Sequence, residues 1–502
     1  KDFYKYAPQI ESFAQVIEDK AKDPINRQVL VEVLQEQYAV LAPSEAVNKN
    51  VSALADEKTY TVTTAHQPSL FTGPLYYIYK IISTINLAKQ LKEAYPAFHF
   101  VPVFVTGGED HDFEEIQNVH LFNKTLTWEN EEKGSVGMMK TDTLGTVLSQ
   151  LKEILGEQAL AVEIYRIVEA AHTQNTIYSQ ASIQLVHQLF KGDGLVVVNM
   201  NHSALKGQFV ETIKKELELQ PSLALIHEAH DAISGIGFKP QATARAINFF
   251  YLKDQIRERI VEENGLYQVL NTDFQFTRAQ ILEEVEQHPE RFSPNVVMRP
   301  IYQETILPNL AYIGGGGELA YWMERRAQFD YFGVNYPMLI RRNSVLWIDK
   351  GMAKKMKKFA FGLPDWFGET ESLIKQFVAH QSESTLSLDQ QKTAFTHLYE
   401  EIKEIAKQVN PTLEKTVMAE HAKQLKSLEH LETKLIRAEK QKHEVGLNQL
   451  RNVKEKLFPA NGLQERKDNF IPFFLKYGWE FFEILKLHLH PLDKNFIVIE
   501  DV

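Results

Sequence analysis

The stretch from Tyr60 to Glu115 restricts the fold of this chain more than any other part of the sequence. Its first residues, 60–65, are mostly β-branched and predict a short strand. After Gly73-Pro74, apolar residues recur every three or four positions and predict a helix. A second apolar run, 98–106, predicts another strand. This order predicts a βαβ unit, in which two parallel strands are joined by a right-handed crossover.

Polar residues follow each strand of this unit. The first strand leads into His66-Gln67, and the second leads into Glu109-Asp110-His111-Asp112. In an open α/β sheet, ligands bind at the carboxyl ends of the strands. We therefore expect Gln67 and the helix start at Gly73-Pro74 to hold an anionic group, with Lys80 as a phosphate or carboxylate contact. The alternative for Lys80 is a solvated surface lysine.

Three later apolar runs are predicted to extend the same sheet. They are 194–199, 296–300 and 337–342, and they contain Asn199, Arg299 and Arg341, in that order. Parallel strands of one sheet share a carboxyl edge, so we expect these three side chains near the polar residues of the βαβ unit. Arginine at such an edge suits a bidentate contact with an anion, and a surface ion pair is the alternative.

Four consecutive glycines, 314–317, precede a predicted helix that begins near Glu318. Glycine lets backbone N–H groups approach an anion at the positive end of a helix. The functional interpretation is that Gly314, Gly315 and Gly317 bind a phosphate or carboxylate, and the structural alternative is a tight turn.

The remaining segments predict insertions, an arm and a returning tail. The α/β core is expected over 1–380, interrupted by insertions at about 121–190 and 233–290. From 381 to 456, apolar residues recur every three or four positions among Glu, Lys and Gln, with a break at Pro411, which predicts an antiparallel coiled-coil arm. Such an arm commonly makes a dimer, and its seam can equally be satisfied within the hairpin. Residues 457–502 are expected to rejoin the core.

Composition and charge exclude several classes of function. A formal net charge of −11 argues against nonspecific nucleic-acid binding, which requires a broad basic surface. The absence of cysteine excludes disulfides, thiolate zinc sites and covalent catalysis through a protein thiol. No apolar run is long enough to cross a bilayer. We therefore expect a cytoplasmic enzyme that acts on small molecules.

The acidic run at 109–112 permits two interpretations. Carboxylates and imidazole are ligands for divalent metals, but adjacent residues of a strand alternate faces, so all four converge only if the strand ends in a turn. We expect no permanent metal here. A hydrogen-bonding or general-base role for Asp110, His111 and Asp112 is the preferred interpretation.

Together these motifs resemble the bacillithiol biosynthesis cysteine-adding enzyme family. The resemblance covers nearly the whole chain and is most specific in the run Glu109-Asp110-His111-Asp112-Phe113. Further matching residues are Gln67, Pro68, Gly73, Pro74, Tyr76, Lys80, Gln241, Arg245, Asn248, Arg299, Pro300, Gln303, Pro308, Gly314, Gly315, Gly317, Glu318, Tyr321, Trp322, Pro337, Arg341, Gln464, Glu465 and Arg466. His66, Asn199 and Gly316 depart from the glutamine, aspartate and proline that the family usually has.

The resemblance implies a Rossmann-like core with connective insertions and a coiled-coil arm that forms a homodimer. It also implies a ligase that joins the carboxyl group of cysteine to the amine of glucosaminyl-malate, and we expect a nucleotide such as ATP to activate that carboxyl group. Asp110, His111 and Asp112 would orient or deprotonate the amine. The expected substrate-binding or nucleotide-binding residues are Gln67, Gly73, Pro74, Lys80, Glu109, Asn199, Arg299, Gln303, Gly314, Gly315, Gly317, Glu318, Tyr321 and Arg341.

Two other functions fit the same residues. A metal-dependent amidohydrolase would use the acidic run from Glu109 to Asp112 to bind its metal. A noncatalytic scaffold would depend on the coiled-coil arm instead. The ligase is preferred because the densest polar clusters lie at the predicted strand ends.

Overall fold

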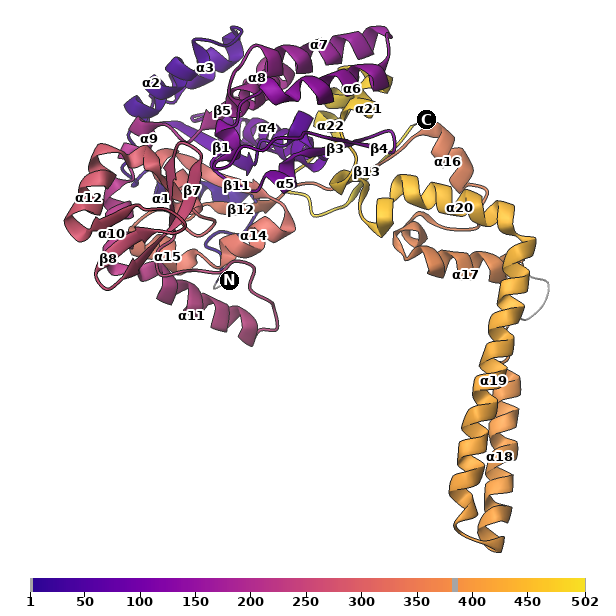
Figure 1. Ribbon diagram of the computed structural model, residues 1–502. Helices are drawn as coiled ribbons and strands as arrows, with labels where there is room; N and C mark the ends of the chain where they lie inside the picture. Colours follow the sequence, from indigo (N-terminus) through magenta and orange to yellow (C-terminus); the bar gives the residue numbers. More distant parts are fainter. Residues whose placement is uncertain (1–2, 382–386, 502) are drawn as a thin grey trace. The chain divides into compact units, whose positions relative to one another are not determined.

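The computed structural model describes residues 3–381 and 387–501, which form two compact units (Figure 1). The first unit contains the described residues up to Val345 together with Glu465–Ile497, and the second contains Leu346–Gln464 and the residues from Val498 onward.

The first unit is built on a five-stranded parallel sheet. Its strands are β1 (Thr59–His66), β2 (His99–Thr106), β5 (Val196–Asn199), β11 (Asn309–Gly314) and β12 (Met338–Arg341). They lie in the order β12-β11-β1-β2-β5, and every neighbouring pair is parallel. This arrangement confirms the predicted α/β, Rossmann-like core. The chain builds outward from β1 in one direction and then returns to build in the other, so the strand order reverses between β1 and β11.

The predicted βαβ unit is confirmed in β1, α4 (Tyr76–Ala94) and β2. The helix α4 contacts both strands, and α22 (Glu480–His488) also packs against it. Almost every side chain in the first half of α4 is therefore buried, including Lys80. The alternative of a solvated surface lysine at Lys80 is wrong.

The prediction of a strand at 296–300 is wrong, because these residues lead into a helix, α13 (Arg299–Ile306). The side chain of Asn295 accepts hydrogen bonds from the backbone N–H groups of Val297 (2.8 Å) and Met298 (3.3 Å), and Pro300 lies in the first turn. This asparagine-closed turn and the early proline of the helix outweigh the β-branched valines here. The fourth strand of the sheet is instead β11, directly before the glycine run.

Two insertions flank the sheet. The first contains a hairpin and helices: β3 (Asn118–Leu121), β4 (Lys124–Thr127), α6 (Gly145–Leu155), α7 (Ala159–Thr173) and α8 (Tyr178–Phe190). The second contains α10 (Val210–Leu219), α11 (Pro221–Gly235) and α12 (Arg278–Gln287) with an antiparallel sheet of β6 (Phe249–Lys253), β7 (Ile256–Glu263), β8 (Leu266–Val269), β9 (Gln275–Thr277) and β10 (Phe292–Pro294). The two insertions meet where Gly134 (φ +89°) lies against Gln255. A Cβ at Gly134 would approach the Gln255 backbone to 2.8 Å.

Other helices of this unit cover the sheet or connect its strands. They are α1 (Phe13–Lys20), α2 (Arg27–Tyr38), α3 (Glu45–Ala53), α5 (Phe113–Ile116), α9 (Ser203–Gly207), α14 (Gly316–Met323), α15 (Arg326–Phe332) and α21 (Ile471–Tyr477).

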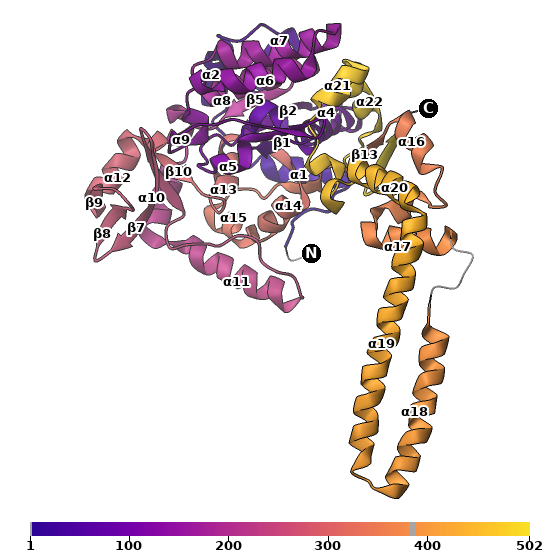
Figure 2. The ribbon, with the colours of Figure 1, turned by 45° about the vertical axis from the view of Figure 1, so that its right-hand side comes forward.

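The second unit carries the arm. Figure 2 shows α18 (Asp389–Val409) and α19 (Leu413–Lys442) side by side, joined by a short turn at Pro411. This pairing confirms the predicted antiparallel coiled-coil arm. The remaining elements are α16 (Lys350–Met356), α17 (Thr370–Gln381), α20 (Glu444–Leu457) and the paired strands β13 (Val345–Ile348) and β14 (Ile497–Glu500), of which most residues belong to this unit. In the described ranges, none of the helices combines the length and the apolar character that crossing a bilayer requires.

Candidate functional site

A pocket of about 480 Å³ lies where the strand order reverses, at the carboxyl ends of β1, β2 and β11. We call it the crevice. This is where ligands bind in open α/β sheets, and the volume suits a small molecule. Its polar lining residues are His66, Gln67, Thr106, Glu109, Asp110, Glu115, Arg257, Asn295, Arg299, Tyr312, Glu318 and Tyr321.

Asp110 is fixed in the crevice from three directions. One carboxylate oxygen, Oδ2, accepts a hydrogen bond from Gln67 Nε2 (2.8 Å), and Oδ1 accepts one from the backbone N–H of His111 (2.8 Å). Arg257 Nη1 lies 3.5 Å from Oδ1. Burial alone would raise the pKa of Asp110, but the His111 side chain 3.3 Å away, the Arg257 charge and these hydrogen bonds hold it well below its usual range. Asp110 is therefore ionised at neutral pH.

Glu109 has a buried counterion. The ammonium group of Lys206, on α9, lies 2.9 Å from both Glu109 carboxylate oxygens and also donates to the Phe292 carbonyl (2.9 Å). The Lys206 side chain is completely buried. Burial lowers the pKa of Lys206, and the Glu109 charge opposes this effect. The Glu109 carboxylate is thus held by the protein itself.

Glu318 and Lys80 form a second buried pair. Lys80 Nζ lies 2.8 Å from both Glu318 oxygens and donates to the Ala65 carbonyl at the end of β1. Glu318 also accepts from Tyr312 Oη (2.8 Å) and from the backbone N–H of Gly315 (3.2 Å). Burial alone would raise the pKa of Glu318, but Lys80 and these hydrogen bonds lower it to about 2. The carboxylate that binds a backbone N–H of the glycine run is therefore that of Glu318, a residue of the protein itself.

Arg299 lies beside this network, with its guanidinium carbon 5.9 Å from the centre of the Tyr312 ring. It donates to Gln303 Oε1 (3.0 Å) and to Tyr321 Oη (3.3 Å), both uncharged. No hydrogen bond or ion pair joins it to a carboxylate anywhere in residues 3–381 and 387–501. Arg299 therefore lines the crevice without a direct ion pair, although the nearby Glu318 charge favours its charged form.

Gln303 links Arg299 to a buried acid, Glu304. Gln303 Nε2 and Asn309 Nδ2 donate to Glu304 Oε1 at 2.9 and 2.8 Å, while Oε2 is buried without a hydrogen-bond partner. Burial raises the pKa of Glu304 to about 7.

Glu304→Gln is expected to change how stability depends on pH. Because the pKa of Glu304 is higher in the folded chain than in the unfolded one, its protonated form favours folding. Its contribution is complete below pH ~4.5 and is lost as pH rises through about 7, which amounts to roughly 3 kcal/mol. Glutamine should abolish this loss, so urea unfolding at pH 8 should show a more stable variant. Equal destabilisation at pH 5 and pH 8 contradicts this prediction, and the exposed Glu11→Gln is the control.

His66 is uncharged at the end of β1. Burial first, and then the Lys80 charge, lower its pKa to about 4. Its Nδ1 lies 3.0 Å from the Gln67 carbonyl oxygen, which can only accept, so Nδ1 carries the proton. The imidazole replaces a glutamine of the related family without adding charge.

The crevice does not include every predicted site residue. Gln67, Glu109, Asp110, Arg299, Glu318 and Tyr321 line it, whereas Lys80 and Gln303 lie behind it as partners of Glu318 and Arg299. Gly73, Pro74, Asp112, Asn199, Gly314, Gly315, Gly317, His111 and Arg341 do not line it.

Some of these residues have other structural roles. The side chain of Asn199 accepts from the backbone N–H of Asn201 (3.1 Å). A Cβ at Gly314 would come within 3.1–3.2 Å of three side chains, whereas Gly317 faces open space. Arg341 lines a different pocket, of about 410 Å³, together with Leu319 and Phe496. The absence of a side chain at Gly314, the last residue of β11, thus has a clear packing reason.

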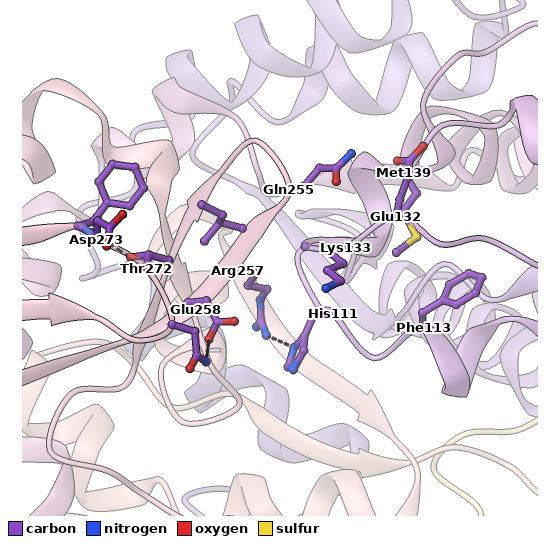
Figure 3. Close-up of a pocket in the computed structure, with 14 residues that line it drawn as sticks. His111, Phe113, Glu132, Lys133, Met139, Gln255, Arg257, Glu258, Thr272 and Asp273 are labelled. Atoms are coloured by element: carbon purple, nitrogen blue, oxygen red, sulfur yellow. Dashed lines mark hydrogen bonds between the residues drawn. The ribbon is translucent and has the colours of Figure 1, made fainter.

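His111 lines a second cavity of about 810 Å³, which lies between the two insertions (Figure 3). Phe113, Lys133 and Gln255 lie on its other walls. Arg257 lines both this cavity and the crevice. The acidic run at 109–112 is therefore divided, with Asp110 on the crevice side of Arg257 and His111 on the cavity side. Within the described ranges, no three His, Cys, Asp or Glu side chains are grouped as metal ligands.

Three important residues were not predicted from the sequence. Arg257 and Lys206 lie on a strand and a helix that no sequence pattern places near Asp110, and both are buried only by tertiary packing. Glu115 was within reach of prediction, since it belongs to the same polar run that contains Asp110.

Comparison with known proteins gives consistent matches along the chain. Residues 1–343 match the bacillithiol biosynthesis BshC N-terminal Rossmann-like domain, and residues 345–500 match the BshC C-terminal coiled-coil domain. Relatives from Flavobacterium psychrophilum and Flavobacterium johnsoniae, each named "Putative cysteine ligase BshC", are both 39% identical to this chain. These alignments cover 100% and 99% of this chain, and 94% of each relative. A Bacillus thuringiensis protein of the same name is 29% identical over 98% of this chain and 93% of its own length.

Proposed function

The chain belongs to the bacillithiol biosynthesis BshC family, and we propose that it is an amide-forming ligase that adds cysteine to the amine of glucosaminyl-malate to give bacillithiol. The observation that carries this proposal within the structure is the distribution of charge in the crevice. A cation, Arg299, makes its hydrogen bonds to uncharged side chains only, and an ionised carboxylate, Asp110, lies in the same pocket.

These two groups suit two different substrate groups. Arg299 offers fixed donors for a substrate carboxylate, such as those of cysteine or malate. Asp110 offers a permanent negative charge that attracts and orients an amine as its ammonium form. Glu115 also lines the crevice, and partial burial with the nearby Asp112 and Asp110 charges raises its pKa. A carboxyl group with a raised pKa is the better proton acceptor of the two.

Amide formation from a free carboxylate requires activation, and we propose that a nucleotide supplies it as a substrate. Transfer of an adenylyl group from ATP to the cysteine carboxylate releases pyrophosphate and gives an acyl-adenylate, whereas transfer of the γ-phosphoryl group releases ADP and gives an acyl-phosphate. Attack by the amine then forms the C–N bond and releases AMP or phosphate. The order of the strands supports this proposal, because the crevice lies at the reversal point that binds nucleotides in this class of sheet.

A single-turnover assay tests the ligase. Purified protein at micromolar concentration is mixed with cysteine, glucosaminyl-malate and ATP, and the amide product is measured by mass spectrometry. Other nucleotides are then tested in turn, and failure to form the amide with any of them contradicts the proposal. Stoichiometric zinc or manganese bound through His111 would instead support the amidohydrolase alternative.

We also propose that the arm forms a homodimer. Apolar side chains of α18 are exposed along the arm, including Ile405 (63%) and Val409 (76%). Exposed apolar residues at heptad-like spacing are covered in coiled coils by a second helix pair. Sedimentation equilibrium of the full chain should give twice 57.8 kDa, and Ile405→Glu should shift it toward the monomer. A wild-type mass of a single chain at 10 μM contradicts this prediction.

A further inference from the structure

We propose that Arg257 is a positioning residue that gives two residues of the acidic run, Asp110 and His111, different roles. It holds Asp110 as the charged group of the crevice and fixes His111 as the tautomer with its proton on Nε2. His111 then serves the cavity between the insertions as a hydrogen-bond donor and not as a base. The catalytic part of this inference rests on the proposed ligase function, whereas the tautomer does not.

Three polar groups meet at one point. Arg257 Nη1 lies 2.5 Å from His111 Nδ1, as the dashed line in Figure 3 shows, and 3.5 Å from Asp110 Oδ1. Asp110 Oδ1 lies 3.3 Å from the same His111 nitrogen. The shortest of these contacts is the one between arginine and histidine.

The chemistry of the two side chains determines where the histidine proton lies. A guanidinium has five N–H donors and no acceptor, so in its contact with Arg257 the Nδ1 atom must be the acceptor. A proton on Nδ1, directed at Asp110, would place two N–H groups against each other at 2.5 Å. The neutral imidazole therefore carries its proton on Nε2, and its one lone pair is already occupied.

Arg257 is rigid enough to enforce this arrangement. Only 8% of its surface is exposed, and its guanidinium stacks 3.9 Å from the centre of the Phe250 ring on the neighbouring strand. It lies on β7, whose pairing with β6 aligns Arg257 with Leu252. His111, by contrast, is 55% exposed on its side chain, so its Nε2–H is available to a ligand in the cavity.

The contact with Arg257 has different consequences for His111 and for Asp110. His111 can accept a proton only if it gives up the hydrogen bond from Arg257, so it is poorly suited to act as a general base. Asp110 keeps its charge and its orientation through the same arginine. The charged or titratable groups that face His111 are Asp110 and Arg257, together with Glu132, Lys133, Glu258 and Asp273 on the cavity walls.

Histidine-selective ¹⁵N NMR on the full chain, without substrate, tests the tautomer. The His111 signals are assigned by their loss in His111→Asn. In the wild type at pH 7 we expect an unprotonated Nδ1 and a protonated Nε2. A proton on Nδ1, or an imidazolium at pH 7, overturns the proposal, whether or not the protein proves to be a ligase.

Variants of Arg257 test its positioning role. Arg257→Met should release His111 to a mixture of tautomers and lower kcat by about 10²-fold, because the reacting groups are no longer held in place. Arg257→Lys keeps a charge and donors and should recover part of both effects. Arg259→Met removes an arginine two residues along the same strand and is the matched control, with wild-type His111 signals expected.

Two outcomes of the variant series would contradict the role. One is a folded Arg257→Met protein, checked by circular dichroism, with unchanged His111 signals. The other is a loss of activity in Arg257→Met that Arg257→Lys does not relieve at all. If Arg257→Met does not fold, the wild-type spectrum still decides the tautomer, and Arg257→Lys decides the role.

Discussion

Asp110→Asn should lower kcat for amide formation by roughly 10²–10⁴-fold. The substitution keeps the size of the side chain but removes the charge that Gln67, Arg257 and the His111 backbone hold in the crevice. An amide group cannot attract and orient an ammonium ion as a carboxylate does. Single-turnover rates at saturating substrate measure this effect directly.

A nearby acid provides the control for Asp110. Glu114 is exposed, lies four residues further along the chain and does not line the crevice. Glu114→Gln removes the same unit of charge and should keep wild-type rates. If Asp110→Asn and Glu114→Gln lose activity equally, the effect reflects net charge and the role of Asp110 is wrong.

Lys80→Met should destabilise the first unit by about 3 kcal/mol, at the lower end of the range for breaking a buried ion pair. Lys80 is completely buried, and without it the Glu318 carboxylate loses its counterion. The lower end applies because 26% of the Glu318 side chain is exposed and can gain some hydration. Urea unfolding at pH 7 measures the change.

A control variant distinguishes loss of the Lys80–Glu318 ion pair from a general effect of substituting a lysine in α4. Lys89 lies on the same helix with 57% of its side chain exposed, and its contact with Asp193 is 3.8 Å. Lys89→Met should therefore cost about 0–1 kcal/mol. The double variant Lys80→Met/Glu318→Gln should be more stable than Lys80→Met alone, because it no longer buries an unpaired charge. A double variant that is as unstable as the sum of its parts contradicts this interpretation.

Sequence patterns predicted much of the sheet because the elements at its centre are neighbours in the sequence. The strands β1 and β2 and the helix between them are consecutive, and their residues follow strand and helix periodicities. The pattern failed at 296–300, where the Asn295 side chain closes a turn ahead of a helix that the valines do not favour. It failed again at β11, a short strand that ends at Gly314, within the glycine run.

The site was predictable only where it lies close to strand ends. Asp110, Gln67 and Arg299 could be proposed because each follows or accompanies an apolar run. The buried cations that contact the acidic run, Arg257 beside Asp110 and Lys206 beside Glu109, come from the second insertion and a short helix. The positions of Arg257 and Lys206 in the sequence do not indicate that they lie near the acidic run, because this proximity depends on how the chain folds back onto the sheet.

The position of β1 at the centre of the sheet has a consequence for synthesis of the chain. One edge of β1 pairs with β2 soon after both are made, but its other edge waits for β11, as the pairing of Thr64 with Ile313 shows. These two residues are 249 positions apart. At about 5–20 residues per second, a ribosome needs roughly 12–50 s to span that interval. During this time a strand that is almost entirely buried in the folded chain has an unpaired edge, which is the kind of surface that other nascent chains can join. Shielding by a chaperone should therefore matter most while residues 67–308 are being made.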